Sequence, residues 1–402
     1  MKSKYKPYSS YRDSGVRWLG DIPESWKVIK TAYLFSSAMG QTILKEDLID
    51  DGRYPVYSAT AEDKFFGYVN YATVKLKKND IVIPARGNSI GFVKLVKDNA
   101  TTTQTTIYCK PLTQRTNPKY VYYYMLGLKP HLFYFVQTAI PQITVSEVLS
   151  NPLLLPPFQD QQTIANYLDS ATAKIDTLIE KQTRLIALLK EKRQAVISTA
   201  VTRGLDNTVA MKDSGVEWLG EIPEHWEVKK LKNSARIQGG KDQKAVLDDN
   251  GKYPVYGSGG IFGYANKYLH NGESVLLGRK GTVDKPLYVH DKFWTVDTMY
   301  YTVIEKTTVA KWLYYSATTI NFDYYQYGSA VPSMTQEDLH NIHFATPDKN
   351  EQQVIVDYLD TKTTQIDSLV SKATKAIELL KEKRTALISS AVTGKIDVRE
   401  IV

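Results

Sequence analysis

Hydrophobic residues recur at a heptad spacing in two long segments of the chain. From Ile164 the apolar positions step by four and three residues, and the same series starts again at Ile355. This spacing is typical of a helix with one narrow apolar stripe. Prolines precede each segment and a glycine follows it, at Pro156, Pro157 and Gly204 and at Pro347 and Gly394. The pattern predicts two uninterrupted helices of about 40 residues, each about 60 Å long.

The two apolar stripes match each other along the chain, so we expect the helices to pair. A globular segment separates them in sequence, and the pair is therefore predicted to be antiparallel with pseudo-twofold symmetry. The alternative is that each helix packs only against its own globular neighbour. The residues predicted to form the seam of the pair are Ile175, Leu178, Leu185, Leu189, Ile366, Leu369, Leu380 and Leu387.

An internal repeat covers most of the chain. Residues 13–26 return almost unchanged as 213–226, and residues 161–202 return as 352–393 with more than half of the positions identical. The segments between these anchors match much less well. A constant frame around a variable insert suits a molecule that holds two different binding modules. If the repeat is also a repeat in space, residues 13–26 lie beside the end of the second helix, and the molecule is circular in plan.

The two inserts, residues 29–150 and 229–345, contain short strands and turns. In each one a buried apolar strand leads into a glycine turn that carries basic and small polar residues. An arginine in such a turn can contact guanine or clamp a phosphate, and Asn88 could contact adenine. The alternative is a solvated surface turn. The candidate DNA-contacting residues are Arg86, Asn88, Lys94, Lys97, Arg279, Lys280, Thr282 and Lys285.

Charge and composition narrow the class of protein without deciding it. The chain has 402 residues, a formal net charge of +8 and a single cysteine, Cys109. A basic protein points weakly to nucleic acid, and the excess charge lies mainly in residues 1–150. One cysteine allows neither an intramolecular disulfide nor a cysteine-based zinc site, and it suits a reducing cytoplasm. The 28 tyrosines have two interpretations, packing in the core or an interaction surface.

Motifs for catalysis are missing from the sequence. There is no Gly-x-x-x-x-Gly-Lys-Ser/Thr loop for phosphate, and no histidine pair has the spacing of a metal site. The segment that begins Asn151-Pro152 lacks the second proline and the aromatic residue of the amino-methyltransferase motif. We found no apolar run long enough to span a membrane. The sequence therefore favours a binding protein over an enzyme.

Together these motifs resemble the DNA-specificity subunit of type I restriction–modification systems. The resemblance covers essentially the whole chain and includes the Leu-Leu-Lys-Glu-Lys-Arg sequence found in both helices. Asp160 departs from the pattern, because the family and the second copy, at Glu351, favour glutamate. The other segments that carry the resemblance are 13–26, 213–226, 156–162 and 347–353, of which the last two lead into Ile-x-x-Tyr-Leu-Asp.

The resemblance implies an α+β protein with two mixed α/β target-recognition domains, joined by two long antiparallel coiled-coil helices in a pseudo-twofold repeat. The implied boundaries are 1–155 for the first recognition domain, 156–206 for the central spacer helix, 207–346 for the second recognition domain and 347–402 for the distal spacer helix. The helices would hold the two domains apart on DNA, whose helical turn spans about 34–36 Å.

The resemblance also implies partners. The chain would be a non-catalytic cytoplasmic subunit that binds double-stranded DNA and docks two methyltransferase subunits, and through them the restriction subunits. S-adenosylmethionine, ATP and Mg are expected on those partners and not on this chain. The competing interpretation is a coiled-coil scaffold without DNA affinity, which the near-neutral second insert supports. A self-contained DNA-modifying enzyme is disfavoured by the missing motifs.

Overall fold

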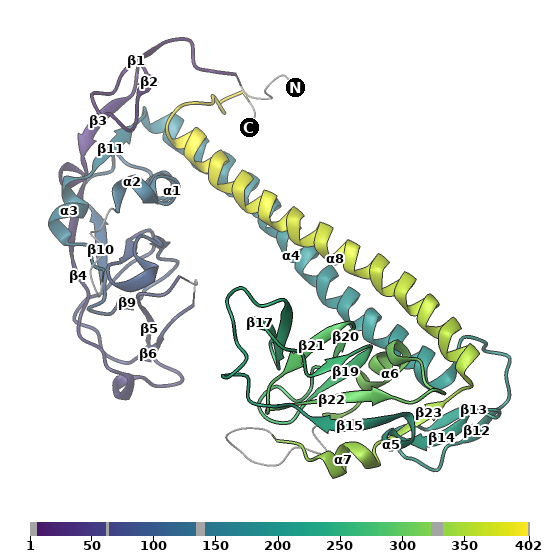
Figure 1. Ribbon diagram of the computed structural model, residues 1–402. Coiled ribbons are helices and arrows are strands. Elements are labelled where there is room, and N and C mark those ends of the chain that lie inside the picture. Colours follow the sequence, from purple (N-terminus) through teal and green to yellow (C-terminus); the bar gives the residue numbers. More distant parts are fainter. Residues whose placement is uncertain (1–5, 62–63, 134–140, 323–332, 401–402) are drawn as a thin grey trace. The chain divides into compact units, whose positions relative to one another are not determined.

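The computed structural model describes residues 6–61, 64–133, 141–322 and 333–400. The chain divides into two compact units (Figure 1). Unit 1 comprises Met1–Gln182 with Lys375–Val402, and unit 2 comprises Thr183–Thr374. Each unit therefore contains one globular domain together with about half of each long helix.

The domain of unit 1 is built from short strands in small sheets. A four-stranded sheet has the order β4-β10-β7-β8, and a second sheet has the order β6-β5-β9. The strands are β1 (Tyr11–Asp13), β2 (Asp21–Pro23), β3 (Lys27–Lys30), β4 (Phe35–Met39), β5 (Tyr54–Tyr57), β6 (Gly67–Val69), β7 (Ile81–Pro84), β8 (Lys94–Leu95), β9 (Thr101–Thr102), β10 (Thr106–Pro111) and β11 (Pro152–Leu155). The short helices are η1 (Thr31–Tyr33), η2 (Lys45–Asp47), η3 (Gly87–Ser89), α1 (Pro118–Gly127), α2 (Lys129–Leu132) and α3 (Val145–Ser150).

The domain of unit 2 repeats this plan with longer strands. Its sheets have the orders β15-β22-β19-β20 and β17-β16-β21-β18. The strands are β12 (Met211–Asp213), β13 (Glu221–Pro223), β14 (Glu227–Lys230), β15 (Ala235–Gly239), β16 (Tyr253–Gly257), β17 (Gly260–Ala265), β18 (His270–Asn271), β19 (Ser274–Gly278), β20 (Leu287–Val289), β21 (Lys292–Thr295), β22 (Met299–Ile304) and β23 (His343–Thr346). The short helices are α5 (Leu231–Ser234), α6 (Ala310–Ala317) and α7 (Gln336–Asn341).

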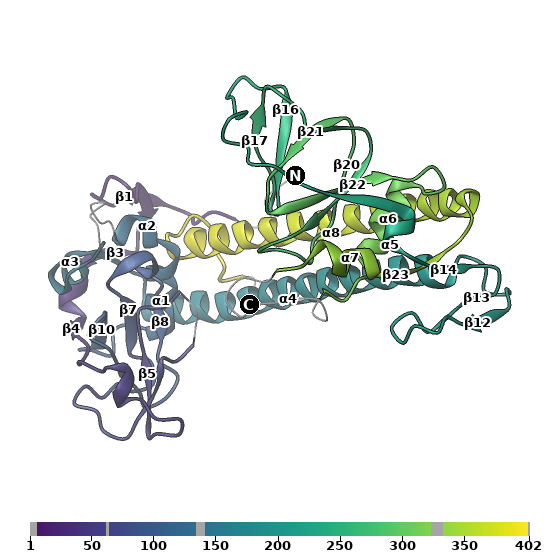
Figure 2. The same ribbon diagram turned by 60° about the horizontal axis from the view of Figure 1, so that its bottom comes forward.

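The two predicted long helices are present, as α4 (Phe158–Arg203) and α8 (Lys349–Val392). Within each unit one half of α4 lies beside one half of α8 (Figures 1 and 2). An ion pair joins them at equivalent places, Arg384 to Asp176 at 2.9 Å in unit 1 and Arg193 to Asp367 at 3.1 Å in unit 2. The prediction of an α+β protein with repeated sheet-containing domains and long helices is confirmed.

The seam between the helices differs in part from the predicted set. Leu178, Leu185 and Leu369 are exposed, so their prediction as buried seam residues is wrong. Ile175, Ile366 and Leu387 are buried, and Leu189 and Leu380 are half-buried. The inward positions that the prediction missed are Ile179, Ile186, Val370 and Ile377, all half-buried. On a helix, the residues three and four positions further on both lie near the same face. After Ile175 and Ile366 the inward residue is the one four positions further on, and the one three positions further on is exposed.

The two ends of the chain meet in unit 1, as the repeat predicts. The backbone of Lys6 pairs with that of Asp397, and the Tyr11 hydroxyl donates to the Gly394 carbonyl oxygen at 2.9 Å. In unit 2 the continuous chain makes the same connection, because Gly204 packs against Trp226 and Pro223 just after α4 ends. The repeated segment, residues 13–26 in unit 1 and 213–226 in unit 2, therefore lies beside a helix end in both units.

Several tyrosines lie in the cores of the two units. Tyr120, Tyr123 and Tyr124 of α1 are buried in the same core as Trp26, and Tyr315 of α6 is buried in the same core as Trp226. The Tyr120 hydroxyl donates to the Leu154 carbonyl oxygen at 3.2 Å, which satisfies its polar tip. The packing interpretation therefore holds for these residues.

Candidate nucleic-acid interface

A basic turn follows the buried strand β7 in unit 1. The Ala85 amide donates to Thr105 and the Gly87 amide to Pro141, at 3.0 and 2.9 Å. Gly87 has φ +70°, and no atom lies near the place of a Cβ, so glycine is needed for the backbone and not for space. Arg86 and Asn88 flank it with exposed side chains. The backbone bonds hold these two side chains at the edge of the sheet.

Unit 2 builds the same turn after β19. The Arg279 amide donates to Thr298 at 2.9 Å, and Gly281 has φ +82°. The backbone of Lys280 bridges to Ser333, as Arg86 bridges to Gln142 in unit 1. Lys280 is therefore the structural counterpart of Arg86. The two turns have a similar backbone conformation but carry different side chains.

Three segments meet at this edge of each domain. In unit 1 the Ser89 hydroxyl of the basic turn donates to Ala59, in the loop after β5, at 2.8 Å. The Thr103 amide of the loop after β9 donates to Tyr57 at 3.0 Å. In unit 2 the Val296 amide donates to Tyr256, which links the segments after β21 and β16. Each basic turn is thus one part of a larger surface at the strand ends.

The remaining residues predicted from the sequence differ in their exposure to solvent. Lys97 and Lys285 are exposed and Thr282 is half-buried. Lys94 is buried, and its Nζ donates to the Ser58 carbonyl oxygen at 3.2 Å and to Thr60 Oγ1 at 2.7 Å. Lys94 therefore holds the loop after β5 in place, and its prediction as a phosphate contact is not supported by this geometry.

Exposed apolar side chains at the same edge were missed by the sequence analysis. Phe65 and Phe66 of unit 1 and Ile261 and Phe262 of unit 2 lie on the surface. Phe92 is also exposed, with the Lys129 ammonium 3.4 Å from the centre of its ring. Burial lowers the pKa of Lys129. The sequence Phe-Gly-Tyr occurs at residues 66–68 and again at 262–264, but nothing in the sequence showed that its phenylalanine is exposed.

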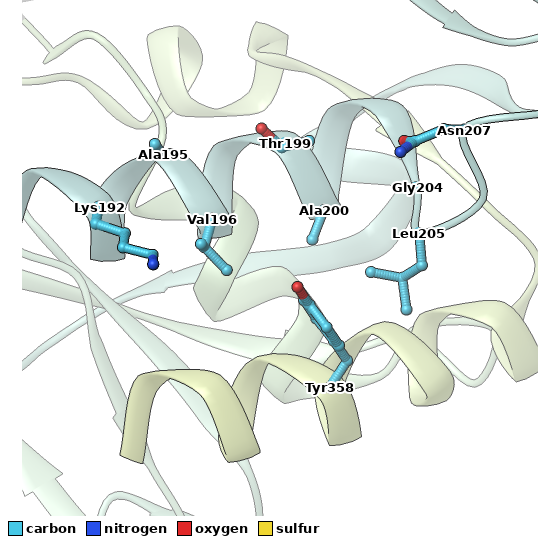
Figure 3. A pocket seen from close by; sticks show the side chains of 9 residues that line it. All are labelled: Lys192, Ala195, Val196, Thr199, Ala200, Gly204, Leu205, Asn207 and Tyr358. Atoms are coloured by element: carbon cyan, nitrogen blue, oxygen red, sulfur yellow. The ribbon is translucent and has the colours of Figure 1, made fainter. Parts of the chain in front are cut away.

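A pocket of about 330 Å³ lies between α4 and α8 in unit 2 (Figure 3). Figure 3 shows Tyr358 of α8 directed towards Val196 and Ala200 of α4, with Leu205 at one end. Tyr358 and Leu205 are exposed. Their repeat counterparts in unit 1, Tyr167 and Ile396, pack against the core. The frame is therefore more open in unit 2 than in unit 1 at this place.

These features define a class of protein, a duplicated frame that presents two related but non-identical binding surfaces. Among the described residues no group of His, Cys, Asp or Glu is placed to hold a metal ion. Over the same residues, no helix is both long and apolar enough for a membrane span.

Comparison with known proteins agrees with this class. A family model described as the type I restriction modification DNA specificity domain matches residues 23–188 and 223–379. The chain belongs to this family, whose members are the non-catalytic specificity subunits of type I restriction–modification systems, and it therefore functions in DNA-target recognition.

One curated relative aligns over nearly the full chain, and another over less than half of it. The MjaVIII specificity subunit of Methanocaldococcus jannaschii is 24% identical over 428 residues, covering 94% of this chain and 95% of that protein. The EcoDI specificity subunit of Escherichia coli is 26% identical over 181 residues, covering 44% and 40%.

Two solved structures share the fold. A chain from a structure of the type I restriction–modification system aligns with a TM-score of 0.72 at 14% identity, covering 92% of this chain and 98% of that one. The HsdS subunit of Thermoanaerobacter tengcongensis aligns with a TM-score of 0.53 at 14% identity, covering 93% and 98%.

Proposed function

We propose that this specificity subunit reads a two-part DNA sequence, with each unit contacting one half-site. The observation that carries the proposal is the duplicated basic turn, which makes equivalent backbone bridges in both units but has different side chains. Arg86 and Asn88 stand where unit 2 has Lys280 and Thr282. Two turns with the same backbone and different side chains are suited to contact two different base sequences in the same kind of duplex.

The exposed side chains have the chemistry for base and phosphate contacts. Arginine can donate two hydrogen bonds to guanine O6 and N7, and asparagine can make a bidentate pair with adenine. Lysine contributes a point charge that suits a phosphate. Arg279 is oriented by a hydrogen bond from its guanidinium to the Asp297 carbonyl oxygen at 3.3 Å. We therefore assign Arg86, Asn88, Arg279 and Lys280 to the DNA contact.

The long helices are proposed to set the separation of the half-sites. At about 1.5 Å per residue, helices of 46 and 44 residues are each roughly 65–70 Å long. That length exceeds one turn of DNA, which spans about 34–36 Å. A non-contacted spacer between the two half-sites is the expected consequence.

Docking of two modification subunits is proposed to use outward-facing leucines on the helices. Leu188 of α4 and its repeat counterpart Leu379 of α8 are 52% and 56% exposed. Leu178 and Leu369 form a second exposed pair at repeated positions. A helix with an inner seam and a further apolar stripe is suited to pack against more than one neighbour. Repetition of the stripe supports two copies of one partner.

The partners are proposed to bring the cofactors. S-adenosylmethionine would bind the modification subunits, and ATP and Mg the restriction subunits. This chain would supply the choice of sequence, and such a role would place it with the DNA in the cytoplasm.

Methylome sequencing tests the proposal. DNA would be taken from cells that express the modification subunit of the same system with this chain, and from cells that express it alone. We expect a split motif, methylated on adenine in both halves, only when this chain is present. An assembled complex without new methylation would instead favour the scaffold without DNA affinity.

A further inference from the structure

Each domain carries an apolar arm outside its core, which we call the aromatic arm. It comprises residues 65–68 in unit 1 and 261–264 in unit 2. Phe66 is 41% exposed and its counterpart Phe262 is 55% exposed. In both units the arm is the edge of a hairpin, formed by β5 with β6 and by β16 with β17; Figure 2 shows β17 as the outer strand beside β16 and β21.

The arms are equivalent position by position. Tyr68 pairs with Pro55 across the first hairpin, and Tyr264 pairs with Pro254 across the second. The glycine between the two aromatic residues lies against a leucine in both units, Gly67 against Leu48 and Gly263 against Leu247. Two domains that differ in most of their sequence therefore keep an exposed phenylalanine at the same place.

The arms are held in position rather than left as free loops. The Phe66 amide donates to the Val56 carbonyl oxygen at 2.8 Å, and Phe65 makes an edge contact with Tyr57 at 5.0 Å between ring centres. The Phe262 ring lies against Gly257. Val56 is fully buried beneath its arm. An ordered apolar surface left outside the core indicates a contact with another molecule.

Each arm continues the candidate interface. In unit 1 the loop that leads to the arm is tied to the basic turn by the bond from Ser89 to Ala59 and by Lys94, which donates to Ser58 and Thr60. In unit 2 the arm follows β16. The Tyr256 carbonyl oxygen of β16 accepts a hydrogen bond from the Val296 amide, and the next residue, Asp297, accepts one from the Arg279 guanidinium. The rings and the basic turn therefore share one edge of each domain.

A cation lies near an aromatic ring beside each hairpin, among acidic residues of the neighbouring loops. The Arg53 guanidinium lies 5.4 Å from the centre of the Tyr54 ring, at the start of the first hairpin. The Lys292 ammonium lies 4.8 Å from the centre of the Tyr268 ring beside the second. Apolar rings interleaved with cations are typical of surfaces that meet both the charged backbone and the apolar faces of nucleic acid.

We propose that the aromatic arms contact DNA in both half-sites, packing on deoxyribose or on the faces of bases. This inference rests on the proposed function. Phenylalanine has no hydrogen-bonding group and cannot read the donor and acceptor pattern of a base edge. Both arms carry a phenylalanine, whereas the turns differ in their side chains. The arms therefore supply affinity that is common to both half-sites, while the turns supply the difference in sequence.

The test measures DNA binding by the complex of this chain with its modification subunits. Phe66→Ala and Phe262→Ala would be titrated against duplexes with the target and with a scrambled sequence, by fluorescence anisotropy at several salt concentrations. We expect each variant to weaken binding of both duplexes by about 10-fold, with an unchanged salt slope because no cation is lost. Phe262→Tyr, which keeps the ring, should bind as the parent does.

Matched controls separate the arm from other exposed apolar residues. Tyr33 is 72% exposed on η1, and its Ala variant should leave DNA binding unchanged, as should Val354→Ala on α8. Unchanged DNA affinity in folded arm variants would overturn the inference. Loss of modification-subunit binding with intact DNA affinity would also overturn it, because the arm would then be a protein contact. A parent complex that binds no DNA would instead refute the proposed function itself.

Discussion

Trp26 and Trp226 occupy the same position in the two copies of the frame but differ in the partner of the indole nitrogen. In unit 2 Trp226 Nε1 donates to Glu351 at 3.0 Å, and His225 Nε2 lies 3.0 Å from the same carboxylate oxygen. Within the described part of unit 1, Trp26 Nε1 is buried without a hydrogen-bond partner. Asp160 stands where unit 2 has Glu351, and its side chain is one methylene shorter.

Asp160→Glu is predicted to stabilise unit 1. The longer side chain can accept from Trp26 Nε1, and satisfying a buried donor contributes about 1 kcal/mol to the free energy of unfolding. Differential scanning calorimetry of the full chain would measure the gain. The matched control is Glu351→Asp, which should lower the stability of unit 2 by a similar amount. A loss in the control without a gain in Asp160→Glu would contradict this explanation.

Arg399, near the C-terminal end of the described chain, interacts with the carboxylates of Asp397 and Asp160. Its guanidinium donates to Asp397 at 2.7 Å and lies 3.7 Å from Asp160. The hydrogen bond from Arg399 lowers the pKa of Asp397 below its ordinary value of 3.8. Burial raises the pKa of Asp160, an effect that Arg399 opposes.

Arg399→Ala is predicted to lower the free energy of unfolding at pH 7 by about 0.5–1 kcal/mol. Because the pKa of Asp397 is lowered in the folded state, the pair stabilises the fold above pH 3.8, and this contribution is lost as the pH falls through the lowered value. The difference between variant and parent should therefore shrink below pH 3.8. Urea unfolding at a series of pH values would measure it, and a constant difference would refute this role of the pair.

At the scale of elements, the long helices carry two apolar stripes rather than one. Leu185 and Ile186 are neighbours in sequence, yet Leu185 is exposed and Ile186 is half-buried. The repeated ion pair from Arg193 to Asp367 lies along the inner stripe. The inner stripe holds the pair together, and the outer one is the proposed docking surface for a partner.

Ile186→Asp is predicted to destabilise unit 2 by about 2 kcal/mol, because it places a charge in the seam. Leu185→Asp, one residue away, is the control and should change stability by no more than about 0.5 kcal/mol. Thermal unfolding followed by circular dichroism would compare them. Equal losses would show that both positions are packed and that the seam is wider than described.

The double variant Leu188→Asp with Leu379→Asp is predicted to fold normally but to lose the modification subunits. Both leucines are exposed at repeated positions, so their replacement should leave the melting temperature almost unchanged. Sedimentation velocity of the mixture would show free subunits in place of the complex. Normal assembly of the double variant would place the docking surface elsewhere.

At the scale of the whole molecule, the proposed assignment of one reader to each unit predicts that the two readers can be exchanged separately. Replacing residues 29–150 with the insert of another specificity subunit should change one half of the methylated motif and leave the other half and the spacer length unchanged. Methylome sequencing of cells with the hybrid would measure all three together. A change in both half-sites would contradict the assignment of one reader to each unit.

The frame was predictable from the sequence to a large extent. The helices end where proline and glycine indicated, and Pro23 and Trp26 lie beside Gly394 as the repeat required. The basic turns were predictable as local structures, because a buried strand and a glycine define them. The exposed rings of the aromatic arms and the burial of Lys94 were not, since both depend on loops distant in sequence.

The sequence by itself determined the repeat, the helices and the turn-bearing strands, because periodicity, capping and glycine geometry act over a few neighbouring residues. Only the tertiary structure decided which stripe of each helix faces inward, which lysine is used to hold a loop, and which apolar side chains stay outside the core. Those outcomes depend on packing between segments far apart in the chain. Local patterns allow several such arrangements, and burial selects among them.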